Sequence, residues 1–74
     1  MKNKTNIPFR VTISLTGSTV STISLAEDEF SDPAILVYLL SSSDEWCVLK
    51  DEWGQTNYIK LANILKIRVE EIKV

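Results

Sequence analysis

The chain has 74 residues, which is enough for one small domain and leaves little material for a deep active-site cleft. Apolar residues make up 45% of it and charged residues 24%, a balance typical of folded globular proteins rather than disordered ones. The 10 acidic and 8 basic residues give a net charge of −2, which argues against a protein that holds duplex nucleic acid through a general basic excess.

Three features of the sequence favour a cytoplasmic location. The single cysteine, Cys47, cannot form an internal disulfide, which suits a reducing compartment. The polar residues 1–6 lack the apolar core of a signal peptide, and we expect them to form a flexible tail ahead of a single small β domain over 7–74. The longest apolar run, residues 34–40, is far shorter than the ~20 residues that span a bilayer, so we expect no membrane segment.

Residues 8–16 are predicted to form the first strand, because apolar and polar side chains alternate there without a break. Its apolar members are Phe9, Val11, Ile13 and Leu15. This pattern indicates a strand with one buried side. Gly17 follows in a turn sequence, and residues 20–25 are rich in β-branched side chains, so they are expected to complete a hairpin. Val20 and Ile23 fall on opposite faces of that second strand, which suggests a bulge or a bend.

An acidic loop over residues 27–32 is expected to separate this hairpin from the rest of the chain. Phe30 within the loop is expected to fold back onto the core. The acids Glu27, Asp28, Glu29 and Asp32 offer oxygen ligands for a hard cation such as calcium, but their spacing matches no EF-hand loop. We therefore interpret them as a solvated loop and predict no metal site.

Residues 33–43 admit two interpretations. Pro33 after an aspartate, followed by Ala34 and several leucines, is typical of a helix start and predicts a short helix over 33–42 in an α+β fold. The β-branched and aromatic residues of the same run, followed by a serine cluster and the apolar segment 45–50, favour a second hairpin instead. We favour the strand, and with it an all-β fold.

The final part of the chain is expected to turn sharply between two strands. Two runs alternate apolar with polar residues; their apolar members are Ile59 and Leu61 in the first, and Leu65, Ile67 and Val69 in the second. The connection over residues 62–64 contains Asn63, which tolerates turn conformations, and it fits one turn of 3₁₀ helix. Strands joined in this way close small barrels, so the predicted fold is an SH3-like antiparallel barrel of about five or six strands.

Two stretches of the sequence carry a resemblance to a known group of proteins. They are Thr12 to Leu15 with Gly17 and Val20, and the closing pattern Tyr58-Ile59-x-Leu61-x-x-Ile64-x-x-Ile67-x-Val69. In these stretches, about half of the chain, the sequence resembles the small SH3-like and Sm-like barrel proteins of phages, plasmids and Gram-positive bacteria, many of them uncharacterised. The resemblance implies a first hairpin with a glycine turn and a tight joint before the last strand. The basic-glycine signature of Sm proteins is absent from residues 60–63, so the resemblance does not extend to their nucleic-acid binding.

Few side chains in the sequence are suited to catalysis. The chain has no histidine, which excludes a general base of the histidine type. Cys47 lies in an apolar run without a basic neighbour to stabilise a thiolate, so we expect a buried, structural thiol. With only Gly17 and Gly54 the chain has no glycine-rich phosphate loop, and it lacks the cysteine and histidine clusters that bind transition metals. We therefore expect a non-enzymatic protein without catalytic residues and without a cofactor.

The predicted function is that of a small interaction module that associates with itself or binds a protein partner. Trp53 in a turn and Tyr58 on a polar strand face are the candidate contact residues. The alternative is a single-stranded nucleic-acid-binding protein, with Lys60, Lys66 and Arg68 on a basic strand face and an aromatic ring nearby for base stacking. An unpaired edge strand would favour a homo-oligomer.

Overall fold

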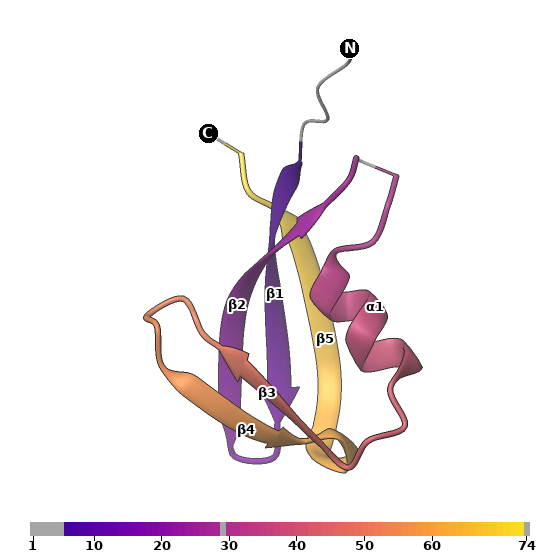
Figure 1. Cartoon of the computed structure of the whole chain (residues 1–74). Coiled ribbons are helices and arrows are strands. Elements are labelled where there is room, and N and C mark those ends of the chain that lie inside the picture. The colour runs from indigo at the N-terminus through magenta and orange to yellow at the C-terminus, as the bar shows by residue number, and fades with distance from the viewer. Residues whose placement is uncertain (1–5, 29, 74) are drawn as a thin grey trace.

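The structure is a computed structural model that describes residues 6–28 and 30–73. In chain order its elements are β1 (Ile7–Leu15), β2 (Ser18–Ala26), α1 (Ala34–Ser41), β3 (Trp46–Lys50), β4 (Thr56–Lys60), the 3₁₀ turn η1 (Leu61–Asn63) and β5 (Ile64–Glu71), as Figure 1 shows. Strands hold 54% of the described residues and helical turns 16%, in two antiparallel sheets and one short helix, so the fold is mostly β. Most of the expected tail, residues 1–5, lies outside the described residues, as do Glu29 of the acidic loop and Val74.

The predicted first hairpin is confirmed. β1 and β2 pair without a register shift around a turn in which Gly17 adopts a φ of +83°. The bulge expected in β2 is wrong, because Val20 and Thr22 both face the core while Ile23 is exposed. The alternation of this strand is regular in space, and it looks irregular in the sequence only because the core position at residue 22 holds a polar side chain.

Residues 34–41 form the helix α1, so the preferred strand and its hairpin with residues 45–50 are wrong, and the alternative short helix is confirmed. Pro33 starts the helix: its carbonyl accepts hydrogen bonds from the N–H groups of Leu36 at 3.0 Å and Val37 at 3.1 Å. The N–H of Ile35 donates to the Ser24 hydroxyl on β2 at 3.0 Å, which ties the helix start to the sheet. These contacts outweigh the strand preference of the β-branched residues. Within the described residues no helix is long and apolar enough to cross a membrane.

The predicted sharp corner before the last strand is also confirmed, as the 3₁₀ turn η1. β5 then pairs with β1, with a register shift between the pairs Ser14↔Lys66 and Leu15↔Ile64. Leu65 is the extra residue of this bulge and is 69% exposed, so its expected burial is wrong. Ile64 packs against the core in its place.

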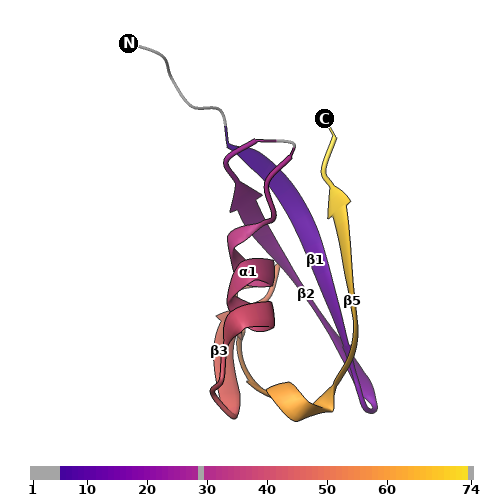
Figure 2. The same cartoon turned by 90° about the vertical axis from the view of Figure 1, so that its right-hand side faces the viewer.

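The core lies between the two sheets, with α1 along one side, as Figure 2 shows. Its buried members are Val11, Ile13, Val20, Leu39, Cys47, Leu49 and Ile59, and Ile67 and Val69 of β5 pack against them. The prediction of a buried Cys47 thiol is confirmed, because this residue is 2% exposed.

Phe30 does not fold back onto the core, contrary to the prediction, and is 90% exposed. The Asp28 carboxylate accepts hydrogen bonds from the N–H of Phe30 at 2.9 Å and from the Ser31 hydroxyl at 3.0 Å. This local turn fixes the backbone of the loop and directs the ring away from the core.

Candidate interaction surface

The second sheet has two different faces. β3 and β4 pair from Trp46↔Lys60 to Lys50↔Thr56, and alternate residues of both strands point inward to the core. The outward residues form a surface that we call the hairpin face, which consists of Trp46, Val48 and Lys50 of β3 and Thr56, Tyr58 and Lys60 of β4. All six of these residues are exposed. The hairpin face is therefore presented to solvent by a sheet whose other side is fixed in the core.

Three apolar residues are neighbours on the hairpin face, from its central pair to the end at Trp46. Val48 lies directly opposite Tyr58, and Trp46 is the diagonal neighbour of Tyr58 across the two strands. Such cross-strand neighbours lie within reach of each other, especially when one is aromatic. Trp46 is 52% exposed, Val48 56% and Tyr58 70%. A cluster of large apolar side chains at this exposure is typical of a surface that contacts another molecule.

Both charged residues of the hairpin face are lysines. Lys60 pairs with Trp46 at one end of the sheet, and Lys50 pairs with Thr56 at the other end. The whole chain has a net charge of −2, but both charged side chains on this face are positive. The arrangement favours a partner that brings acidic groups to either end of an apolar contact.

The turn between β3 and β4 is held by Asp51. Its carboxylate accepts hydrogen bonds from the N–H groups of Trp53 at 2.9 Å and Gln55 at 3.0 Å, and from the Asn57 side-chain amide at 3.2 Å. Burial raises the pKa of Asp51, but the bonds from Gln55, Asn57 and Trp53 outweigh it and lower the pKa below its ordinary value. Gly54 completes the turn with a φ of +82°. Trp53 is left at the tip, 77% exposed.

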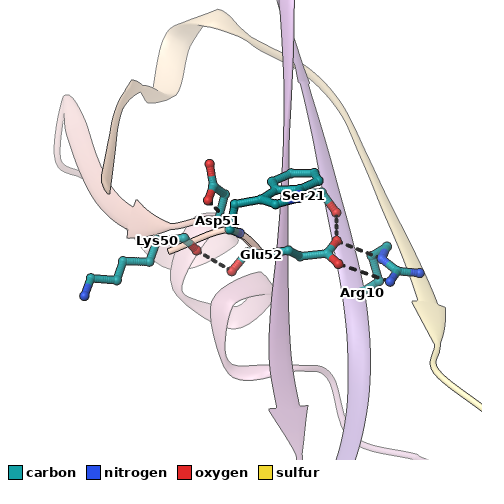
Figure 3. A network of polar contacts seen from close by, with 7 residues as sticks. Arg10, Ser21, Lys50, Asp51 and Glu52 are labelled. Atoms are coloured by element: carbon teal, nitrogen blue, oxygen red, sulfur yellow. Dashed lines mark hydrogen bonds and ion pairs between the residues drawn. The ribbon is translucent and has the colours of Figure 1, made fainter. Parts of the chain in front are cut away.

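Glu52, the next residue of the turn, links the β3–β4 hairpin to β1 and β2, as Figure 3 shows. Its carboxylate accepts hydrogen bonds from Nε of Arg10 at 2.8 Å, from an outer guanidinium nitrogen of Arg10 at 3.1 Å, and from the Ser21 hydroxyl. Its N–H donates to the Ser21 carbonyl at 3.0 Å, and the Thr22 hydroxyl donates to the Lys50 carbonyl at 2.7 Å. The bonds from Arg10 and Ser21 lower the pKa of Glu52. Because this acid is turned toward β1 and β2, it does not neutralise the hairpin face.

The structure assigns the predicted site residues to different sheets. Tyr58 and Lys60 both lie on the hairpin face, and Trp53 lies at the tip of the same hairpin. Lys66 and Arg68 lie together on the exposed outer side of β5, in the other sheet. The three cations therefore do not form the single strand face that the sequence suggested.

Sequence reasoning missed Trp46, Val48 and Lys50 as site residues. The signal was present in the alternation of the segment 46–50: once Cys47 and Leu49 are taken as buried, the residues between them must point outward. Their partnership with Tyr58 depends on the register with β4, which a single sequence does not specify.

Apart from the hairpin face, the described residues offer little for chemistry. Burial raises the pKa of the Cys47 thiol, which keeps it protonated at neutral pH. No group of three or more His, Cys, Asp or Glu residues within 6–28 and 30–73 could hold a metal ion. An open hollow of about 510 Å³ lies where the end of β2 meets α1, with Leu25 and Val37 in its wall beside Glu27 and Asp32.

Comparisons with known proteins found no relative of this chain. No protein-family model matches the sequence, and no curated protein or solved structure matches the chain.

Proposed function

We propose that this chain is a non-enzymatic interaction module that binds a protein partner through the hairpin face. The observation that carries the proposal is the exposed cluster of Trp46, Val48 and Tyr58 on a sheet whose opposite side is buried. Each of the two rings leaves on the order of 100 Å² to be covered, which corresponds to about 2–3 kcal/mol of transfer free energy per ring before the costs of association. Two such anchors on a rigid support are typical of the residues that dominate protein interfaces.

The charged and apolar side chains of the hairpin face indicate the chemical character of the partner. Lys50 and Lys60 stand at the two ends of the apolar cluster, about two strand residues from its centre. An extended segment with apolar side chains between acidic ones would match both properties. Trp53, at the tip of the same hairpin, is 77% exposed and is the proposed further contact residue.

The proposed fold type is an SH3-like arrangement, related to the small barrels that the sequence resembles. Support comes from the pairing of β1 with β5 and from the 3₁₀ turn that joins β4 to β5. The proposed location is a reducing compartment such as the cytoplasm, since the one cysteine is a free, buried thiol. In this proposal the protein acts by contact alone, without a catalytic residue or a cofactor.

A random-peptide display library, selected against the full chain, tests the proposal directly. We expect enrichment of peptides in which aromatic or aliphatic residues alternate with acidic ones. Trp46→Ala and Tyr58→Ala should each weaken binding of the selected peptides by about tenfold or more, as for interface anchors in general. Leu65→Ala, which removes an equally exposed apolar side chain from the other sheet, is the matched control and should leave binding unchanged. Selected peptides that bind all three variants like the wild type would overturn the proposal.

A second candidate function, binding of single-stranded nucleic acid, is favoured by one observation. Trp46 pairs with Lys60, and Tyr58 lies next to both, which places rings for base stacking beside a cation for phosphate. Fluorescence anisotropy with labelled oligothymidylate separates the two functions. Nucleic-acid binding predicts affinity that falls steeply with salt, by about 0.7 in log K per log salt for each phosphate contact. It also predicts loss of binding in Lys60→Glu, whereas no binding at low salt removes this candidate.

A further inference from the structure

The outer edge of β5 is open for pairing. The first sheet has the strand order β2-β1-β5, and among the strands of the described residues only β1 pairs with β5. In Figure 2, β5 runs up one side of the molecule, on the far side of the sheet from β2 and apart from α1. An edge strand presents a row of N–H and C=O groups that can pair with another strand.

The register with β1 determines which residues offer those groups. The N–H of Ile72 donates to the Pro8 carbonyl at 3.0 Å, which continues the ladder that pairs Phe9 with Glu71. In an antiparallel ladder, hydrogen-bonded and non-bonded pairs alternate along the strand. Residues 66, 68 and 70 therefore direct their backbone groups toward β1, and residues 67, 69 and 71 direct theirs to the open edge.

The charges on β5 are self-complementary. Lys66, Arg68 and Glu70 lie on the same exposed side of the strand. If two copies of β5 pair antiparallel with Val69 opposite Val69, each Arg68 faces a Glu70 of the other copy. A shift of the twofold axis to residue 70 places Glu70 opposite Glu70. A shift to residue 68 pairs Lys66 with Glu70 but places Arg68 opposite Arg68. Like charges directly opposite each other destabilise a pair of strands, so charge favours the register centred on Val69, which is the one of the three without such a pair.

The hydrogen-bond pattern permits this register, as it permits those centred on residues 68 and 70. With Val69 at the centre, the residues that face each other through their outward backbone groups are Val69 with Val69, and Ile67 with Glu71. The backbone N–H and C=O groups of these residues make no hydrogen bonds to β1. Arg68 and Glu70 form the closer, non-bonded pairs that lie between the hydrogen-bonded ones. Arg10, which lies opposite Glu70 within the sheet, is already bound by Glu52.

We propose that two copies of this chain associate by antiparallel pairing of their β5 edges, with the twofold axis at Val69 and Arg68 of each copy facing Glu70 of the other. The pairing joins the two first sheets into one continuous sheet. The paired residues all lie on β5, so the strand pairing does not involve the hairpin face. The inference therefore does not rest on the proposed function.

Charge exchange tests this dimer in the full chain. Sedimentation velocity over a range of concentrations should show a reversible dimer for the wild type. Arg68→Glu and Glu70→Arg each place like charges opposite each other at two symmetric positions, so each alone should weaken the dimer by about tenfold or more. An equimolar mixture of the two variants should recover the dimer, because every facing pair in the mixed dimer is then of opposite charge. Failure of the mixture to recover it would overturn the proposal, as would a wild-type chain that stays monomeric throughout.

Two further variants check the register and the backbone contacts. Lys66→Glu should leave the dimer intact, because residue 66 faces Ile72 beyond the end of β5; a dimer weakened by this change would overturn the register centred on Val69. Glu71→Pro removes an outward N–H without removing a bond to β1, so it should weaken the dimer while the far-UV circular dichroism and the Tm stay close to wild type. A Glu71→Pro chain that dimerises like the wild type would contradict pairing through the β5 edge.

Discussion

Replacement of Leu39 by alanine tests how α1 is attached to the core. Leu39 is the buried residue of the helix, at 8% exposure. The change removes about three methylene equivalents, or about 2.4 kcal/mol of transfer free energy, and the remaining cavity brings the expected loss to about 3 kcal/mol. At 0.05–0.15 kcal/mol per residue, a chain of this length has a total unfolding free energy of roughly 4–11 kcal/mol. Leu39→Ala is therefore expected to lower the Tm by roughly 12–24 °C.

Two neighbouring substitutions serve as matched controls for Leu39→Ala in urea denaturation followed by circular dichroism. Leu40→Ala removes the same atoms from a side chain that is 70% exposed and should cost less than about 1 kcal/mol. Val37→Ala, at a position 51% exposed, should also cost little. A strand over this segment would place residues 37 and 39 on one face. A loss for Val37→Ala as large as that for Leu39→Ala would thus refute the helix.

Three further predictions concern the hairpin and its fastening. Glu52 has a lowered pKa in the folded chain, so its charge stabilises the fold above the ordinary carboxyl pKa of 4.5, and this contribution is lost as the pH falls through the folded-state pKa. The Tm of the wild type should therefore fall more steeply on acidification than that of Glu52→Gln, and parallel curves would speak against the Arg10 contact. The buried Cys47 thiol should react with Ellman's reagent only as the protein unfolds in urea; rapid labelling in buffer would contradict its burial. Gly54→Ala meets no atom within 4 Å of the added Cβ, so backbone strain alone should lower the unfolding free energy by about 1 kcal/mol, and a neutral change would contradict the left-handed turn.

The features of this fold that could be predicted are those determined by neighbouring residues in the sequence. Strict alternation from Phe9 to Leu15 and the glycine after it specified the first hairpin. Asn63 in a connection too short for a loop specified the 3₁₀ corner. In each case the feature depends on neighbours in the sequence, which is why a single chain was sufficient.

The errors arose where distant contacts decided the outcome. The segment after Pro33 has mixed local preferences, and the Ser24 hydroxyl on β2 favours the helix through a bond to Ile35. Leu65 reads as one more inward residue of an alternating strand, but the bulge opposite Leu15 turns it outward. Neither the Ser24 bond nor the bulge is visible without the tertiary arrangement.

The candidate site was predictable in kind but not in extent. Tyr58 and Trp53 were expected to be exposed aromatic residues, and the structure places both on the β3–β4 hairpin with high exposure. The grouping of Lys60 with Lys66 was based on their expected place on the polar side of the last two strands. The corner between β4 and β5 moves the chain from one sheet to the other, so the two lysines belong to different surfaces.

The most direct test of the central claim is a titration of the ¹⁵N-labelled chain with the tightest peptide selected from the display library, followed by heteronuclear NMR. If the hairpin face is the binding surface, the largest amide shifts will fall in β3 and β4, and the indole N–H of Trp46 will shift with them. Shifts confined to β5, or to the hollow between the end of β2 and α1, would contradict the proposal that this protein binds its partner through Trp46, Val48 and Tyr58.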